Sequence, residues 1–251
     1  MSNYQLLSAE HFGNKRWQRY SNYRFAAQHM VAPITLYELH RASLCLPLAF
    51  MAHKDGMKLA AVTGFQHGQN LLLDAHGQWR VDYIPAVYRS YPFALVPLKD
   101  GNNAIAVDMD SGLITDREGA PLLDAQGKLT EEVSAVVDFL TQLEAGKSIT
   151  DKACQVLQQH DLLVPWKLEV ELASGQRQLR GLYRVDENRL NALSAESLKE
   201  VQSKNGLMLI YLHLLSLQHI NQLHKWAMAE PAPQDVEGLF EGQDDTLKFN
   251  F

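Results

Sequence analysis

The spacing of apolar residues changes near the midpoint of this chain, and that change limits the folds that the chain can adopt. Between residues 46 and 109, short apolar runs alternate with tight-turn residues, which is typical of strands joined by hairpins. From Val133 onwards, apolar residues recur at helical spacing instead. Because the first half has turns where a parallel sheet would need crossover helices, its strands are predicted to be antiparallel. The chain is therefore predicted to be α+β: an antiparallel, β-rich N-terminal half, helices plus one β-hairpin in the C-terminal half, and a flexible acidic tail.

Two pairs of strands are predicted in the first half. The apolar runs Leu46–Ala52 and Met57–Phe65 flank Asp55-Gly56, a pair favoured where a tight hairpin needs positive φ. The runs Tyr91–Leu98 and Ala104–Met109 flank a second turn that contains glycine and asparagine. Each pair is therefore predicted to form a hairpin.

The second half is predicted to contain several helices and one hairpin. Thr130 is a good N-cap for the helix that follows it, and Gly146 is predicted to end that helix. Thr150 is then expected to cap a second helix. Alternating residues in Leu168–Leu172, with Gln178–Arg184 after the next turn, predict the hairpin.

A long helix over residues 207–228 is predicted to close the folded part, after two short helices capped by Asp186 and Ser194. Its first eleven residues, 207–217, are strongly apolar. Spanning a bilayer takes about 20 apolar residues, and polar residues follow at once. We therefore expect a buried helix here and no membrane span.

The charge balance is acidic, but unevenly so. Lys and Arg number 23 against 29 Asp and Glu, a formal net charge of −6. This balance disfavours a general nucleic-acid binder, which would present a basic face, and a polybasic attachment to lipid. Residues 229–251 carry six acidic side chains and one basic side chain. We therefore predict one α+β domain over residues 1–228 and an acidic, flexible tail over 229–251.

The end of that tail is apolar. Leu247, Phe249 and Phe251 alternate with polar residues, a pattern that would let the terminus add as a strand to a sheet edge of this chain or of a partner. An acidic tail that stays solvated is the alternative. Both interpretations stay open at this point.

The segment from Trp79 to Phe93 is rich in aromatic and arginine side chains. We predict a binding surface here, whose residues are Trp79, Tyr83, Arg89, Tyr91 and Phe93. Such residues are typical of peptide-docking grooves. The alternative is an aromatic corner that joins sheet to helix, with arginine stacked on a ring.

Evidence for catalysis is weak by comparison. His53 and Asp55 have the spacing used by iron oxygenases, and His67, His76 or His160 would have to supply the third ligand. A hairpin turn explains Asp55 better. Asp108 and Asp110 stand where a calcium loop could begin, but the rest of the calcium-loop pattern is missing, so acidic turn residues explain them better.

The two cysteines are too few for a disulfide framework, and the apolar surroundings of Cys45 should raise its thiol pKa. No nucleophile elbow, phosphate loop or dinucleotide fingerprint occurs in the sequence. We therefore assign no catalytic residue, no cofactor and no metal ligand.

The order of several short motifs resembles the SapC family of bacterial proteins, over about residues 33–226. The matching residues are Gly64, Gly68, Asn70, Leu71, Gly77, Trp79, Tyr83, Pro85, Ala86, Arg89, Tyr91-Pro92-Phe93, Asp108, Asp110-Ser111, Gly119, Pro121-Leu122, Gly127, Phe139-Leu140, Gly181-Leu182, Asp186-Glu187, Leu190 and Leu207–Leu217. The chain departs from the family at Ser90, where relatives often carry a second arginine. It also departs at Leu71-Leu72, where an aromatic residue is common.

The resemblance implies an accessory role and supplies no catalytic residue. The family is named for an association with surface-layer proteins, and its members often occur beside flavin-dependent halogenases, cupin-like oxygenases and outer-membrane receptors. We expect a non-catalytic, cytoplasmic binding protein with a protein or peptide partner, or a second copy as in a homodimer. One alternative is a metal-dependent oxygenase or hydrolase acting on peptides through His53 and Asp55. The other is a structural component of the surface layer.

Overall fold

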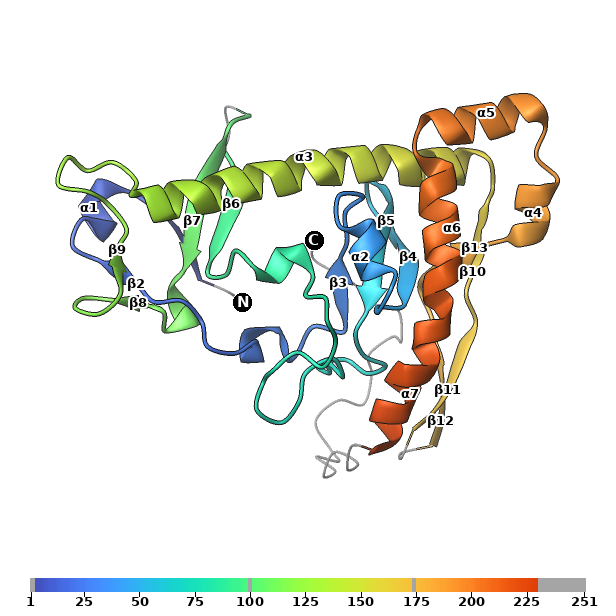
Figure 1. The fold of residues 1–251 in the computed structure, drawn as a ribbon, viewed down its shortest axis with the longest axis horizontal. Helices are drawn as coiled ribbons and strands as arrows, with labels where there is room; N and C mark the ends of the chain where they lie inside the picture. Colours follow the sequence, from blue (N-terminus) through green and yellow to red (C-terminus); the bar gives the residue numbers. More distant parts are fainter. Residues whose placement is uncertain (1–2, 99–100, 173–174, 230–251) are drawn as a thin grey trace.

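The computed structural model describes residues 3–98, 101–172 and 175–229, and its fold is α+β (Figure 1). The strands are β1 (Tyr4–Leu6), β2 (Arg16–Trp17), β3 (Val31–Pro33), β4 (Leu48–His53), β5 (Gly56–Val62), β6 (Phe93–Pro97), β7 (Asn103–Asp108), β8 (Ile114–Thr115), β9 (Ala120–Pro121), β10 (Leu163–Pro165), β11 (Leu168–Leu172), β12 (Gly175–Leu179) and β13 (Leu182–Val185). The helices are α1 (Ala9–Phe12), α2 (Leu39–Ala42), α3 (Glu131–Gln159), α4 (Glu187–Asn191), α5 (Ala195–Ser203), α6 (Gly206–Ser216) and α7 (Ile220–Ala229). Short 3₁₀ turns are η1 (Arg24–Ala26), η2 (Ala86–Tyr88), η3 (Met109–Ser111) and η4 (Leu217–His219).

The main sheet has the strand order β10-β13-β4-β5-β3, with antiparallel pairing throughout. The predicted hairpin at its centre is confirmed: Phe50 of β4 pairs with Leu59 of β5, and Gly56 takes the positive φ of 108° that the turn needs. Strand β13 then joins β4 from the second half of the chain. The main sheet therefore draws strands from both halves.

Three smaller sheets lie beside it. Strands β6 and β7 form the second predicted hairpin, which β1 extends. Strand β2 pairs with β8 and β9, and β11 pairs with β12. The antiparallel character predicted for the first half is confirmed in every one of these pairs.

Helix α3 runs along most of the molecule, from β6 and β7 to β5 (Figure 1). The predicted end at Gly146 is wrong. A Cβ atom on Gly146 would lie 2.8 Å from Cδ2 of Tyr37, so glycine is needed here for close packing rather than for a helix end. The predicted cap at Thr150 is also wrong. Its hydroxyl donates to the carbonyl of Gly146 (2.7 Å) and accepts from the backbone N–H of Leu36 (2.8 Å).

The predicted hairpin of the second half is confirmed, but the bounds of its second strand are wrong. Strand β12 begins at Gly175, and the chain turns at Gly181, whose φ is 85°. Beyond this turn the chain pairs with β10 and β4 as β13, while β12 pairs with β11. The predicted strand Gln178–Arg184 therefore spans two strands with different partners.

The predicted caps at Asp186 and Ser194 are confirmed, since both side chains accept hydrogen bonds from backbone N–H groups of the next turn. The single helix predicted over 207–228 is wrong, because η4 divides it into α6 and α7. The Ser216 hydroxyl donates to the carbonyl of His213 (2.6 Å) and accepts from Leu48 (3.1 Å). Serine bonded back to the preceding turn bends helices. Among the described helices, none is long and apolar enough to cross a membrane.

Apolar side chains form one large and two smaller clusters. The large cluster lies between the main sheet, α3 and α6, and includes Phe50 and Leu157. The second surrounds Trp17, Phe93 and Leu122, and the third surrounds Tyr88. The acidic tail after α7, with Leu247, Phe249 and Phe251, lies outside the described residues, so its flexibility and docking stay predictions.

Candidate functional site

The predicted binding residues Trp79, Tyr83, Arg89, Tyr91 and Phe93 do not form one open surface. Tyr83 and Phe93 are buried, Trp79 and Tyr91 are partly buried, and Arg89 is exposed. The structure brings Tyr83 and Arg89 together and places the other three against different neighbours. Arg89 therefore has the most surface available to a partner, and Trp79 and Tyr91 have part of theirs.

A buried carboxyl group, that of Glu38 at the start of α2, lies beneath this segment. The side chain of Glu38 is 5% exposed. Its Oε1 accepts from the backbone N–H (3.0 Å) and the hydroxyl (3.2 Å) of Thr35. Its Oε2 accepts from the Tyr83 hydroxyl (2.8 Å) and the backbone N–H of Ala86 (2.7 Å). Four donors therefore hold this group and, through it, the ring of Tyr83.

Two exposed arginines stack on Tyr83. Arg89 Nη2 donates to the Tyr83 hydroxyl (3.0 Å), and Arg89 Cζ lies 5.3 Å from the ring centre of Phe139 in α3. Arg41 Cζ lies 5.2 Å from the ring centre of Tyr83. Burial, reinforced by the Glu38 carboxylate, raises the pKa of Tyr83 well above its usual value. Tyr83 therefore stays protonated and donates to Glu38.

Aromatic residues near the N-terminus complete the surroundings of the predicted segment. The rings of Phe25 and Tyr91 are stacked, with centres 4.0 Å apart and an angle of 12° between their planes. Tyr20 contacts Phe25 at 5.2 Å, and Tyr23 contacts Trp79 at 5.9 Å. Tyr91 also donates a hydrogen bond to Asp108 Oδ2 (3.3 Å). The result is a partly exposed aromatic surface built from two distant segments.

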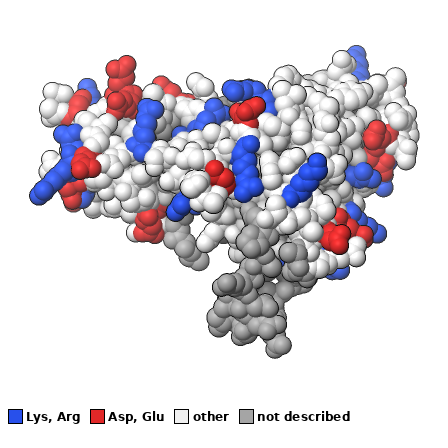
Figure 2. Space-filling model, turned by 60° about the horizontal axis from the view of Figure 1, so that its bottom comes forward, with Lys and Arg blue, Asp and Glu red and all other residues white. Residues whose placement is uncertain are grey.

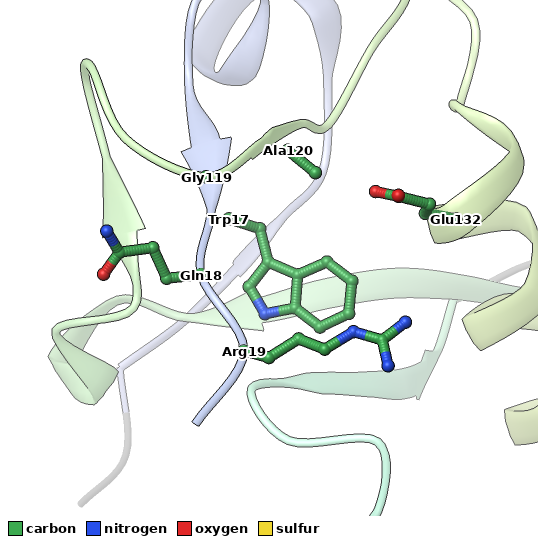
Figure 3. A pocket seen from close by; sticks show the side chains of 6 residues that line it. All are labelled: Trp17, Gln18, Arg19, Gly119, Ala120 and Glu132. Carbon is green, nitrogen blue, oxygen red and sulfur yellow. The ribbon is translucent and has the colours of Figure 1, made fainter. Parts of the chain in front are cut away.

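A pocket of about 430 Å³ lies on the far side of Phe93, and Figure 3 shows the indole of Trp17 at its centre with Glu132 of α3 to one side. The rings of Trp17 and Phe93 meet edge to face, 4.8 Å apart. Arg19 Cζ lies 5.7 Å from the Trp17 ring centre. The pocket therefore presents an indole flanked by one cation and one anion.

Three exposed arginines lie around these aromatic residues, and we call them the arginine trio: Arg19, Arg41 and Arg89. Burial raises the pKa of Tyr20 to about 12, against the opposing positive charges of Arg89 and Arg19. Arg19 precedes Tyr20 in the chain, the ring of Tyr20 contacts Phe25, and Phe25 stacks on Tyr91, two positions after Arg89. Figure 2 shows one face of the molecule, where basic and acidic side chains are interspersed on a largely uncharged surface. On that face the basic residues do not merge into a continuous patch.

His53 and Asp55, two of the residues proposed for metal binding, lie close together, but the described residues supply no third ligand beside them. His53 Nδ1 lies 3.4 Å from Asp55 Oδ2 within the β4–β5 turn. In the part of the chain that the structure describes, no three His, Cys, Asp or Glu side chains form a group that could hold a metal ion. Asp108 caps η3 by accepting from the backbone N–H of Asp110 (3.1 Å). Burial raises the pKa of the Cys45 thiol, as its apolar surroundings predict.

Comparison with known families decides the group to which the chain belongs. The family model SapC matches residues 7–223, most of the chain. The chain belongs to the SapC family. The resemblance in the sequence is thus confirmed. No curated protein and no solved structure matches the chain.

Several residues of this SapC-family site were missed by the sequence analysis. They are Trp17, Arg19, Tyr20, Phe25, Glu38 and Arg41. A signal was present for most of them, since residues 16–25 are as rich in arginine and aromatic side chains as the Trp79–Phe93 segment. The role of Glu38 had no such signal, because an acidic residue on a short helix is ordinarily solvated.

Proposed function

We propose that this SapC-family chain is a non-catalytic binding protein that recognises a protein or peptide partner through the arginine trio and the neighbouring aromatic rings. One observation carries the proposal: the exposed guanidinium groups of Arg41 and Arg89 lie over the ring of Tyr83, whose hydroxyl is bonded to the buried Glu38. Arginine and aromatic side chains in rigid surroundings are the residues that dominate protein interfaces.

The test is a selection of phage-displayed random peptides on the immobilised full-length chain. Variants Arg89→Ala and Tyr91→Ala should lose at least about nine-tenths of the binding of the selected phage, the loss expected for hot-spot residues. Arg180→Ala, which removes an exposed arginine between β12 and β13, is the matched control and should keep it. Tyr83 and Phe93 are poor test positions because both are buried.

Two outcomes would refute the proposal: selection that yields no specific peptide, or peptides that bind the Arg89→Ala and Tyr91→Ala variants as well as they bind the unaltered chain. A folded state common to all variants is checked by thermal unfolding. The absence of a metal-ligand group among the described residues gives no support to the oxygenase or hydrolase alternative, so we do not propose it.

We also propose an accessory role in the cytoplasm. Fractionation of cells that produce the native protein tests this location. A cytosolic pool supports it, whereas a pool in the cell envelope would favour the surface-layer alternative.

A further inference from the structure

Among the described residues, the arginine trio forms no ion pair with an acidic side chain. Arg19 lies over Trp17 (5.7 Å), and Arg41 and Arg89 lie over Tyr83 (5.2 and 5.7 Å). Over residues 3–98, 101–172 and 175–229, no carboxylate lies within 4.0 Å of any of these three guanidinium groups. Because these three arginines form no direct ion pair with a described side chain, their charge is available to an anion outside the described fold.

Two of these guanidinium groups are held in place before any ligand arrives. The Tyr83 hydroxyl accepts from Arg89 and donates to Glu38, which is itself fully bonded. Glu38 is buried and already accepts four hydrogen bonds, so it does not compete with an incoming anion for the guanidinium groups. A side chain ordered in advance loses less conformational entropy on binding. The guanidinium of Arg89 keeps further N–H donors for a ligand, since it has five in all.

We propose that the arginine trio binds an acidic peptide segment of a protein partner, through guanidinium–carboxylate pairs. This inference rests on the proposed function and names the chemistry that the surface recognises. Planar guanidinium groups match carboxylates with two parallel hydrogen bonds. Acidic side chains two residues apart in an extended peptide are roughly 6.5–7 Å apart. Arg41 and Arg89, which share one ring, are close enough to meet such a pair.

The partly exposed rings beside the arginines favour a peptide over a simple anion. Tyr20, Phe25 and Tyr91 are each half-buried and contact one another around the stacked pair. These rings would pack against an apolar side chain that lies between the acidic residues of the bound peptide. A nucleic acid is the less favoured ligand, because its affinity depends on many phosphate contacts along a basic face. The chain has 23 Lys and Arg against 29 Asp and Glu, which disfavours such a face.

The experiment uses a synthetic fluorescent copy of a peptide selected on the full-length chain and a second copy in which every Asp and Glu becomes Asn or Gln. Fluorescence anisotropy should show about tenfold weaker binding for the amide copy, and for Arg41→Ala or Arg89→Ala, as expected for loss of one charged hydrogen-bonding pair. Arg89→Lys should fall in between, because it keeps charge but not the paired geometry. The control Arg180→Ala should bind normally, and added NaCl should weaken binding.

The outcomes separate this inference from the function on which it rests. Peptides that need Arg89 but bind equally well as amide copies would overturn the acidic specificity and leave the binding function standing. Peptides that bind Arg41→Ala and Arg89→Ala as tightly as they bind the unaltered chain would overturn both. Tighter binding of a labelled single-stranded oligonucleotide than of any selected peptide would also overturn the proposal. Loss of binding in Arg41→Ala or Arg89→Ala counts only if the variant unfolds at the same temperature as the unaltered chain.

Discussion

Glu38 shows how one buried side chain organises a surface from beneath. Its carboxyl group links the start of α2 to the Tyr83–Ala86 segment, which lies more than forty positions later in the chain. Tyr83 in turn supports Arg41 and Arg89. A buried polar group of this kind is stable because every donor around it is matched.

We predict that Glu38→Ala lowers the free energy of unfolding by about 2–4 kcal/mol, because unpartnered buried donors cost about 1–3 kcal/mol each. Urea denaturation measures the change. Glu169→Ala, at an exposed position of β11, is the control and should stay within about 0.5 kcal/mol. Equal stabilities of the two variants would show that the Glu38 network contributes nothing.

His213 makes stability depend on pH. Burial, aided by the positive charge of Arg184, lowers the pKa of His213 from 6.5 to about 3. The unfolded chain therefore binds a proton below pH 6.5 that the folded chain does not. This contribution to stability is complete above pH 6.5 and is lost as the pH falls toward 3, by up to about 1.4 kcal/mol per pH unit.

The variant His213→Gln tests this dependence. Its amide can still accept from the backbone N–H of Val185, as Nε2 of His213 does at 3.3 Å. Urea denaturation between about pH 7 and pH 5 should show a shallower fall in stability for the variant than for the unaltered chain. If the free energy of unfolding falls equally with pH in both proteins, His213 does not cause the pH dependence.

At the scale of elements, α3 owes its length to tertiary contacts. Gly146 lies in its interior, where glycine is less favourable than alanine by about 1 kcal/mol. The ring of Tyr37 passes so close that a Cβ atom would lie 2.8 and 3.2 Å from two of its carbons. Glycine therefore suits this position of α3, because the segment that carries Tyr37 passes against the helix here.

We predict that Gly146→Ala alone lowers the free energy of unfolding by about 1 kcal/mol, since overpacking outweighs helix propensity. In a Tyr37→Ala background the same change should instead stabilise by about 0.5–1 kcal/mol. Urea denaturation of the two single variants and of the double variant measures the coupling between Gly146 and Tyr37. The same sign in both backgrounds would argue against the Tyr37 contact.

At the scale of the whole molecule, α3 joins two cores. Its first half supplies Val133 and Leu140 to the cluster around Trp17 and Phe93. Its second half supplies Val156 and Leu157, among others, to the main cluster. A continuous helix shared in this way couples the two cores mechanically, because neither can unfold without exposing part of it.

We therefore predict one cooperative unfolding transition for the domain over residues 1–228. Leu122→Ala in the smaller core and Leu157→Ala in the main core should lower the midpoint of that same transition, since each opens a cavity at a fully buried site and costs about 2–5 kcal/mol. Calorimetry is the measurement. Two transitions, each moved by one variant, would instead indicate two domains.

For the fold, local patterns in the sequence determined the α+β class, both N-terminal hairpins and the caps at Asp186 and Ser194. These features depend on neighbouring residues, so their signals are short. The continuation of α3 past Gly146 and the break at Ser216 came from contacts with Tyr37 and Leu48. Such contacts join residues far apart in the chain and leave no local pattern.

For the candidate site, the sequence by itself singled out Arg89 and Tyr91 through the density of aromatic and arginine residues around them. Tertiary structure alone decided that Tyr83 and Phe93 are buried and that Arg41 and Arg89 lie over the same ring. It also brought Tyr20, next to Arg19, against Phe25, on which Tyr91 stacks. It also placed Glu38 beneath Tyr83. Composition shows which side chains are available, but burial and pairing depend on which distant segments the fold packs together.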